Sequence, residues 1–198
     1  MQKILIATAN RGKLQEIQAL LEDLPLTLLI PPDLGLALEI AETGETYAAN
    51  AALKASAFAS LSGLLTLSDD SGLEVDALGG LPGVRSARFS PLPRATDADR
   101  RRYLLQLLAE KPRPWTAHFH CTVALALPTG EVYYADGDCP GEIIPEERGD
   151  NGFGYDPIFL LPGPGRTMAE LTMSEKNSLS HRARAIQAAR PRLLQFLG

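Results

Sequence analysis

The sequence predicts an α/β fold built around a mixed sheet. Short apolar segments of strand character alternate with amphipathic helical segments along the chain, which favours this architecture. The early units suit parallel strands joined by helical crossovers. Farther along, residues 116–127 and 131–135 are two strand-like segments joined by a Pro-Thr-Gly turn, which predicts an antiparallel hairpin. One sheet with both kinds of pairing follows.

In the first half of the chain, apolar runs predict strands, and apolar residues at helical spacing predict helices. Leu14 and Ile17 mark the apolar face of the first helix, and the alanine-rich second helix carries Asn50 and Lys54 before Gly63 ends it. The elements expected here are strands at residues 3–7 and 26–30 and helices at residues 14–21 and 45–61.

The second half continues the alternation. The acidic pair Asp69 and Asp70 is expected at a turn between two short strands, and Pro191 is expected to interrupt the last helix. A glycine-punctuated loop precedes that helix. The expected elements are strands at residues 64–68, 73–77, 116–127 and 131–135, helices at residues 97–109 and 178–197, and a loop at residues 149–156.

Length and composition predict one continuous domain over residues 1–198, with two lobes permitted. The chain is 45% apolar and 22% charged, so it can bury roughly 70% of its unfolded surface. We find neither a linker-like segment nor a run approaching the ~18 apolar residues of a membrane span. The opening residues do not resemble a signal peptide. A cytoplasmic protein is therefore expected.

The net charge limits the possible binding partners, and the cysteine content limits the possible disulfides and metal sites. The formal net charge of −5 argues against a nucleic-acid partner, because a polyanion usually requires a basic surface. A single nucleotide needs only a local cluster of cations and is permitted. Cys121 and Cys139 are too few for a disulfide framework and lack zinc-type spacing, so we expect buried, reduced thiols.

The first candidate site is the corner Thr8-Ala9-Asn10-Arg11-Gly12-Lys13, between a strand and a helix. Backbone amides at a helix start, a hydroxyl, a carboxamide and a lysine suit a phosphate group. It is not a P-loop, because Ala7 and Leu14 stand where that motif requires glycine and Ser or Thr. The alternative is an ordinary turn capped by Asn10.

The second candidate is Asp69-Asp70-Ser71-Gly72, with Glu42 in an acidic loop upstream. Hard oxygen ligands are what magnesium requires. Neighbouring side chains on a strand point to opposite faces, so we expect only one of the two aspartates to face a ligand. A plain Asx-turn is the alternative.

The third and fourth candidates lie in the C-terminal third. In Gly152-Phe153-Gly154-Tyr155-Asp156-Pro157, glycines allow close approach of the backbone and an aromatic ring offers a stacking face to a base; a tight turn is the alternative. In residues 175–182, cations stand at a helix start, where the helix dipole disfavours them. An anionic or carbonyl-bearing ligand explains them better than solvation, although a solvated helix face stays open.

Two other polar clusters favour structural interpretations. His118 and His120 share a strand face without a third ligand nearby, which indicates satisfied or partly exposed histidines instead of a metal site. Arg100-Arg101-Arg102, beside Asp97 and Asp99, indicates a solvated helix face.

In this order and at these separations, the four segments resemble the inosine/xanthosine triphosphate pyrophosphatase family over nearly the whole chain. Thr8, Asn10 and Lys13 match the family's Thr/Ser-x-Asn-x-x-Lys pattern, and residues 69–73 match its Asp-Asp-Ser-Gly-Leu. The other matching segments are residues 42–44, 50–55, 78–83, 152–159, 175–176 and 180–182. Each is weak alone, whereas the ordered set is specific.

The resemblance implies a curved mixed sheet with flanking helices, two lobes around an active-site cleft, and a homodimer. It also implies a small-molecule nucleotide substrate, Mg²⁺ as cofactor, and hydrolysis of ITP, dITP or XTP to the monophosphate and pyrophosphate. Asp70 would be catalytic and would bind the metal with Glu42. The substrate-binding residues would be Thr8, Ala9, Asn10, Arg11, Gly12, Lys13, Lys54 and Ser71 at the phosphates, and Phe153, Gly154, Tyr155, Asp156, Lys176, His181 and Arg182 at the base.

Three competing functions remain open from the sequence. A nucleotide sensor could use the same phosphate corner without a catalytic acid, although the acidic pair speaks against it. A pyrophosphatase for modified pyrimidine nucleotides would differ in its base pocket. A phosphatase acting on the γ-phosphate would release orthophosphate instead of pyrophosphate.

Overall fold

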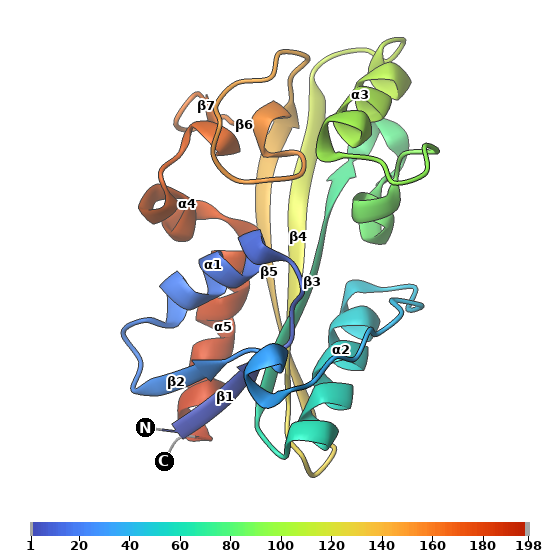
Figure 1. Ribbon diagram of the computed structural model, residues 1–198. Coiled ribbons are helices and arrows are strands. Elements are labelled where there is room, and N and C mark those ends of the chain that lie inside the picture. The colour runs from blue at the N-terminus through green and yellow to red at the C-terminus, as the bar shows by residue number, and fades with distance from the viewer. Residues whose placement is uncertain (1, 197–198) are drawn as a thin grey trace. The chain divides into compact units, whose positions relative to one another are not determined.

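One sheet organises the chain in the computed structural model, which describes residues 2–196 (Figure 1). Its seven strands lie in the order β2-β1-β3-β4-β5-β6-β7. The strands are β1 (Gln2–Ile6), β2 (Leu26–Leu29), β3 (Thr66–Val75), β4 (Trp115–Ala126), β5 (Val132–Ile143), β6 (Phe159–Leu161) and β7 (Arg166–Thr167). The α-helices are α1 (Arg11–Leu21), α2 (Tyr47–Ser62), α3 (Asp97–Leu108), α4 (Met173–Leu179) and α5 (His181–Gln195).

The sheet is mixed, as predicted. Strand β1 pairs in parallel with both β2 and β3, whereas β5, β6 and β7 pair antiparallel. Strands β4 and β5 are neighbours, and the turn between them is closed where the Leu127 N–H donates to the Glu131 carbonyl at 2.8 Å. The α/β class and the hairpin predicted from the sequence are confirmed.

The described residues form two compact units. Unit 1 contains the chain to Asp70, residues 121–137 and the chain from His181; unit 2 contains residues 71–120 and 138–180. Three strands run through both units, since each of β3, β4 and β5 has residues in each range.

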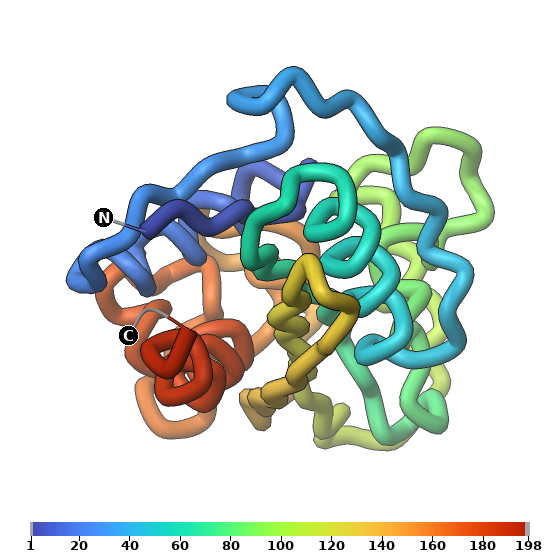
Figure 2. The backbone as a smooth tube through the Cα atoms, turned by 90° about the horizontal axis from the view of Figure 1, so that it is seen from below, coloured from blue at the N-terminus to red at the C-terminus, as the bar shows by residue number. Residues whose placement is uncertain are grey.

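Unit 1 places helices on both faces of its part of the sheet. Figures 1 and 2 show α1 and α5 side by side on one face and α2 on the other. The alternation of β1 supplies both layers: Ile4 and Ile6 pack toward α1 and α5, and Leu5 packs toward Phe58 of α2. Each helix therefore buries an apolar stripe against the parallel strands.

Unit 2 has its own core. Leu104 and Leu108 of α3 pack with Trp115 and Phe119 of β4 and with Phe159 of β6. The rings of Phe119 and Phe159 lie 4.4 Å apart between centroids. This core supports the loops that join β5, β6 and α4.

Three element boundaries differ from the prediction. Strand β3 is continuous through Asp69 and Asp70, because their carboxylates have partners on the helices and no turn is needed to expose them. Strand β5 continues to Ile143 because Cys139 and Ile143 are buried in the core of unit 2. The last helical segment breaks at Ser180 and continues through the exposed Pro191, because the buried stripe of α5 outweighs one lost hydrogen bond. The predicted helix end at Leu197 lies outside the described residues.

Candidate functional site

The corner between β1 and α1 has the local structure of a helix cap. Asn10 is the N-cap residue, and its side-chain oxygen accepts from the Lys13 N–H at 3.1 Å. The Thr8 hydroxyl accepts from the Asn10 N–H at 3.2 Å. Ala9, Asn10 and Arg11 are exposed, so the corner presents a helix start and its side chains at the surface of unit 1.

Asp70 is held from α2. Its carboxylate accepts from the Asn50 amide at 3.0 Å, and the Asn50 oxygen accepts from the Gly44 N–H at 2.8 Å. A Cβ on Gly44 would lie 2.7 Å from Asn50 Oδ1, so only glycine allows this approach. Burial raises the pKa of Asp70, and the charges of Lys13 and Lys54 offset only part of that effect.

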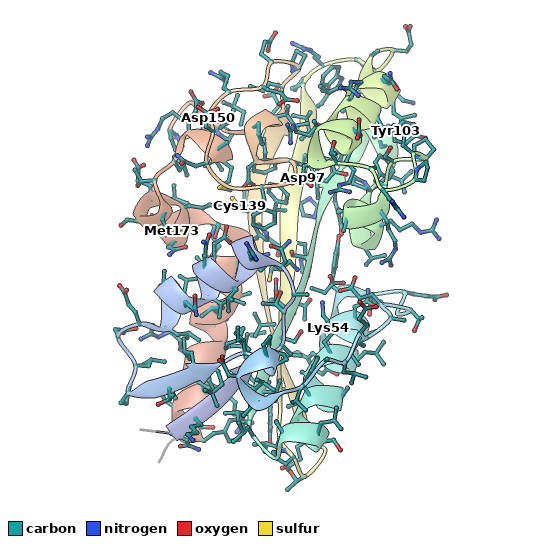
Figure 3. The ribbon with its side chains drawn as sticks, viewed as in Figure 1. Lys54, Asp97, Tyr103, Cys139, Asp150 and Met173 are labelled. Atoms are coloured by element: carbon teal, nitrogen blue, oxygen red, sulfur yellow. The ribbon has the colours of Figure 1, made fainter. Side chains whose placement is uncertain are left out.

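Glu42 and Lys54 form an ion pair, and both interact with Asp70. The Lys54 ammonium lies 2.6 Å from the Glu42 carboxylate. Burial alone would lower the pKa of Lys54, but the charges of Asp69, Glu42 and Asp70 raise it above its ordinary value. Lys54, labelled in Figure 3, therefore stays a cation beside three carboxylates of unit 1.

Two acidic side chains of unit 1 are of the chemical type that holds a divalent cation. Asp70 and Glu42 provide hard oxygen donors, and each interacts with Lys54. Among residues 2–196, no three His, Cys, Asp or Glu side chains gather into a closed metal cage. Magnesium commonly keeps its waters and uses one or two carboxylates together with substrate phosphates.

Asp69 faces away from Asp70, as the strand alternation predicted. Its Oδ2 atom lies 3.0 Å from the Arg182 Nε and 3.1 Å from the Lys13 Nζ. Arg182 also pairs with Glu16 of α1. The side chains of Asp69, Arg182 and Glu16 are all 2% exposed or less. Burial alone would raise the pKa of Asp69, but the charges of Lys13, Arg182 and Lys54 hold it well below its usual range.

The aromatic loop, residues 152–157, lies in unit 2. The Phe153 N–H donates to the Asp156 carboxylate at 2.9 Å, and the Lys176 ammonium pairs with the same carboxylate at 2.5 Å. That ammonium also lies 5.1 Å from the centroid of the Phe153 ring. Asp156 and Lys176 are buried, whereas Phe153 is partly exposed. The loop thus holds an aromatic ring beside a fixed cation.

A family model, similar proteins and a solved structure all match nearly the whole chain. A family model described as "Ham1 family" matches residues 4–192. The chain belongs to the Ham1 family. It is 47% identical over 197 residues to the dITP/XTP pyrophosphatase of Exiguobacterium sibiricum, with 99% of each chain covered, and 46% identical over 186 residues to that of Geobacter sulfurreducens, with 94% of each covered. A HAM1 protein structure from Coxiella burnetii has a TM-score of 0.88 and 41% identity, covering 98% of this chain and 100% of that one.

In this Ham1-family chain, the predicted site residues divide between the two units. The phosphate corner, Glu42, Lys54, Asp70, His181 and Arg182 belong to unit 1, whereas Ser71, the aromatic loop and Lys176 belong to unit 2. His181 is buried as the first residue of α5. The Tyr155 ring packs in the core of unit 2, and its hydroxyl donates to the Ser86 carbonyl at 3.0 Å.

The cations of residues 175–182 have partners within the protein. We expected a ligand to explain them, but Asp156 pairs with Lys176, and Asp69 and Glu16 pair with Arg182. Protein carboxylates therefore offset these charges. Sequence reasoning missed Glu16 altogether, although an acid between the apolar residues of α1 was a usable signal.

The solvated face predicted for Arg100, Arg101 and Arg102 is right only for Arg102, whose side chain is 64% exposed. Arg101 is 12% exposed and donates to the Gly154 carbonyl at 2.8 Å, and Arg100 pairs with Asp97. The partner of Arg101 is 53 positions away in the sequence. No local pattern could have indicated that contact.

The remaining polar residues behave as predicted. His118 lies 3.3 Å from Glu74, and His120 lies 2.7 Å from Asp138, so both are satisfied strand histidines. Cys121 and Cys139 are buried, and neither forms a disulfide. None of the helices in the described part of the chain is long and apolar enough for a membrane span.

Proposed function

We propose that this Ham1-family chain hydrolyses purine nucleoside triphosphates that carry a 6-keto base, namely dITP, ITP and XTP, to the monophosphate and pyrophosphate. The relatives that it matches over nearly their full length are named dITP/XTP pyrophosphatases. The structural observation that carries the proposal is the position of Asp70, which is buried and interacts with both Lys13 and Lys54. A carboxylate between two lysines suits water activation beside phosphate groups.

The phosphates are assigned to residues 8–13 and Lys54 of unit 1 and to Ser71 of unit 2. Helix α1 begins at the corner formed by residues 8–13, where free N–H groups and the helix dipole attract anions. Lys13 and Lys54 add positive charge on either side of β3. Ser71 follows Asp70 on that strand and would donate to a phosphate oxygen.

Asp70 is assigned the attacking water. Its carboxylate would orient the water toward the α-phosphorus and accept its proton, while Asn50 fixes the carboxylate. Glu42 and Asp70 would hold magnesium, which offsets the charge of the phosphates when bound. Asp69 instead holds Lys13 and Arg182, so the two neighbouring acids have different tasks.

The base is assigned to Phe153 as a stacking surface, with Gly154, Tyr155 and Asp156 shaping the loop. Lys176, His181 and Arg182 are assigned to the edge of the base, where donors favour a 6-keto oxygen. Adenine presents an amino group there, and a buried donor left unpaired costs about 1–3 kcal/mol. This difference would reject ATP. The proposal also includes the cytoplasm as location, which is expected from the sequence, and a homodimer, which the family resemblance implies.

The test is a panel of nucleoside triphosphates incubated with Mg²⁺, with both products identified. We expect pyrophosphate and a monophosphate from dITP, ITP and XTP, little product from ATP, and loss of turnover when EDTA removes the metal. Release of orthophosphate would instead support a γ-phosphatase, and binding without product would support a sensor. Light scattering of the same sample tests the dimer.

The Asp70→Asn variant tests the catalytic assignment. We expect kcat to fall by roughly 100-fold or more, the range typical of a lost general base, with an unchanged circular dichroism spectrum. The control is Asp33→Asn, which changes an exposed aspartate in the turn after β2. Near-normal pyrophosphate release by folded Asp70→Asn would overturn the assignment.

A further inference from the structure

The start of α3 forms hydrogen bonds to the aromatic loop at Gly154. The Gly154 N–H donates to the Asp97 carboxylate at 2.8 Å, and the Gly154 carbonyl accepts from Arg101 Nη1 at 2.8 Å. Both polar groups of this residue are thus bound by charged side chains from one helix turn. Asp97, labelled in Figure 3, lies where the start of α3 meets this loop.

Asp97 and Arg101 are themselves held in place. Arg101 Nη2 pairs with Glu147 at 2.7 Å, and Asp97 pairs with Arg100. Helix α3 is fixed by its Thr96 cap and by Leu104 and Leu108, which are fully buried in the core of unit 2. The contacts to Gly154 therefore hold this irregular loop against a helix that is packed in the core.

The consequence for Phe153 follows from its place in the chain. The Phe153 N–H is bound by Asp156 on one side, and the next residue is bound by α3 on the other. Gly154 has a φ of +63°, a conformation that side-chain-bearing residues rarely adopt, so the loop turns sharply just after the ring. Contacts within the protein therefore hold the backbone on both sides of Phe153.

We propose that Asp97 and Arg101 are positioning residues that hold the aromatic loop in its base-binding conformation. The proposal rests on the proposed function, since it concerns how the base is bound. A preorganised loop binds its ligand more tightly, because less ordering is required on binding. Apparent affinity falls in proportion to the fraction of molecules in which the loop is competent.

The Arg101→Met variant is the main test, because methionine keeps an apolar stem but removes the Nη1 and Nη2 donors that bind Gly154 and Glu147. We expect KM for dITP to rise about fivefold to tenfold with kcat changed less than about twofold, the pattern of lost uniform binding. Inhibition by IMP, which carries the base, should weaken by a similar factor. Inhibition by inorganic pyrophosphate, which lacks a base, should not change. General damage would weaken both inhibitors and would overturn the proposal.

Two further variants and one control complete the design. Arg101→Lys keeps the charge and one group of donors, and Asp97→Asn keeps an acceptor for the Gly154 N–H. Each should therefore weaken inhibition by IMP less than Arg101→Met does. The control is Arg102→Met on the same helix turn, where the side chain is 64% exposed and pairs with Asp99. Its KM should match that of the wild-type protein.

Hydrogen exchange measured by mass spectrometry tests the loop without any substrate. In Arg101→Met, exchange in residues 149–157 should become faster while the strands β3 and β4 keep their protection. Unchanged exchange and unchanged IMP inhibition in a folded variant would overturn the positioning role. A wild-type protein without pyrophosphatase activity would instead overturn the proposed function, and the exchange result would still decide whether α3 holds the loop.

Discussion

The buried ion cluster of unit 1 allows the cost of one missing charge to be worked out. In Arg182→Leu, the replacement keeps apolar volume next to β3 but removes the guanidinium that Asp69 and Glu16 share. All three side chains are 2% exposed or less, so water cannot replace the lost partner. Lys13 still lies 3.1 Å from Asp69, so Asp69 keeps one cationic partner in the variant, whereas Glu16 loses its ion pair with Arg182.

Removing one partner of a buried ion pair typically destabilises a protein by about 3–5 kcal/mol. With a urea m-value of about 2–3 kcal/mol/M, the unfolding midpoint should fall by roughly 1–2.5 M. The assay is urea unfolding followed by far-UV circular dichroism. Arg190→Leu is the matched control, because Arg190 also joins α5 to the end of α1 but pairs with Asp23, whose side chain is 61% exposed. Such a surface pair contributes about 1 kcal/mol or less.

A double variant separates lost charge from lost packing. In the double variant, Glu16→Leu removes the Glu16 carboxylate and Arg182→Leu removes the guanidinium that pairs with it, while Asp69 keeps Lys13 as a partner. Its midpoint should therefore lie above that expected from adding the two single effects. Loss of less than 1 kcal/mol in Arg182→Leu, or strict additivity in the double variant, would refute this reasoning.

Two further predictions concern protonation and thiol reactivity. Glu175 accepts hydrogen bonds from Arg166 and from Thr172, which lower its pKa from 4.5 to about 2. A lowered pKa stabilises the folded state only while the group is ionised there. The stability of the wild-type protein relative to Glu175→Gln should therefore be greatest at pH 7 and should shrink as the pH falls from 4.5 toward 2. Melting temperatures across that range measure it, and a constant gap would contradict it. Cys121 and Cys139 are both buried, and burial together with the charge of Asp69 raises the pKa of Cys121. Because both thiols are shielded, neither should react with a thiol reagent until urea unfolds the chain. Rapid labelling of the native protein would contradict this prediction.

The sequence alone determined the features that depend on neighbours along the chain. The mixed sheet follows from its strand and helix periodicities, the Asn10 cap from a polar residue before an apolar stripe, and the end of α2 from Gly63. Strand alternation also predicted that Asp69 and Asp70 point to opposite faces. The ordered motifs led to the family.

The tertiary structure alone decided which partners the charged side chains have within the protein. Arg182 meets Glu16 from 166 positions away, and Arg101 meets Gly154 from 53 positions away. Such pairs leave no periodic signal, because a charged residue has the same local sequence whether water, a ligand or a distant carboxylate receives it. For the same reason Asp69 and Asp70 were expected in a turn: only the helices packed beside β3 supply the partners that let two acids lie inside a strand.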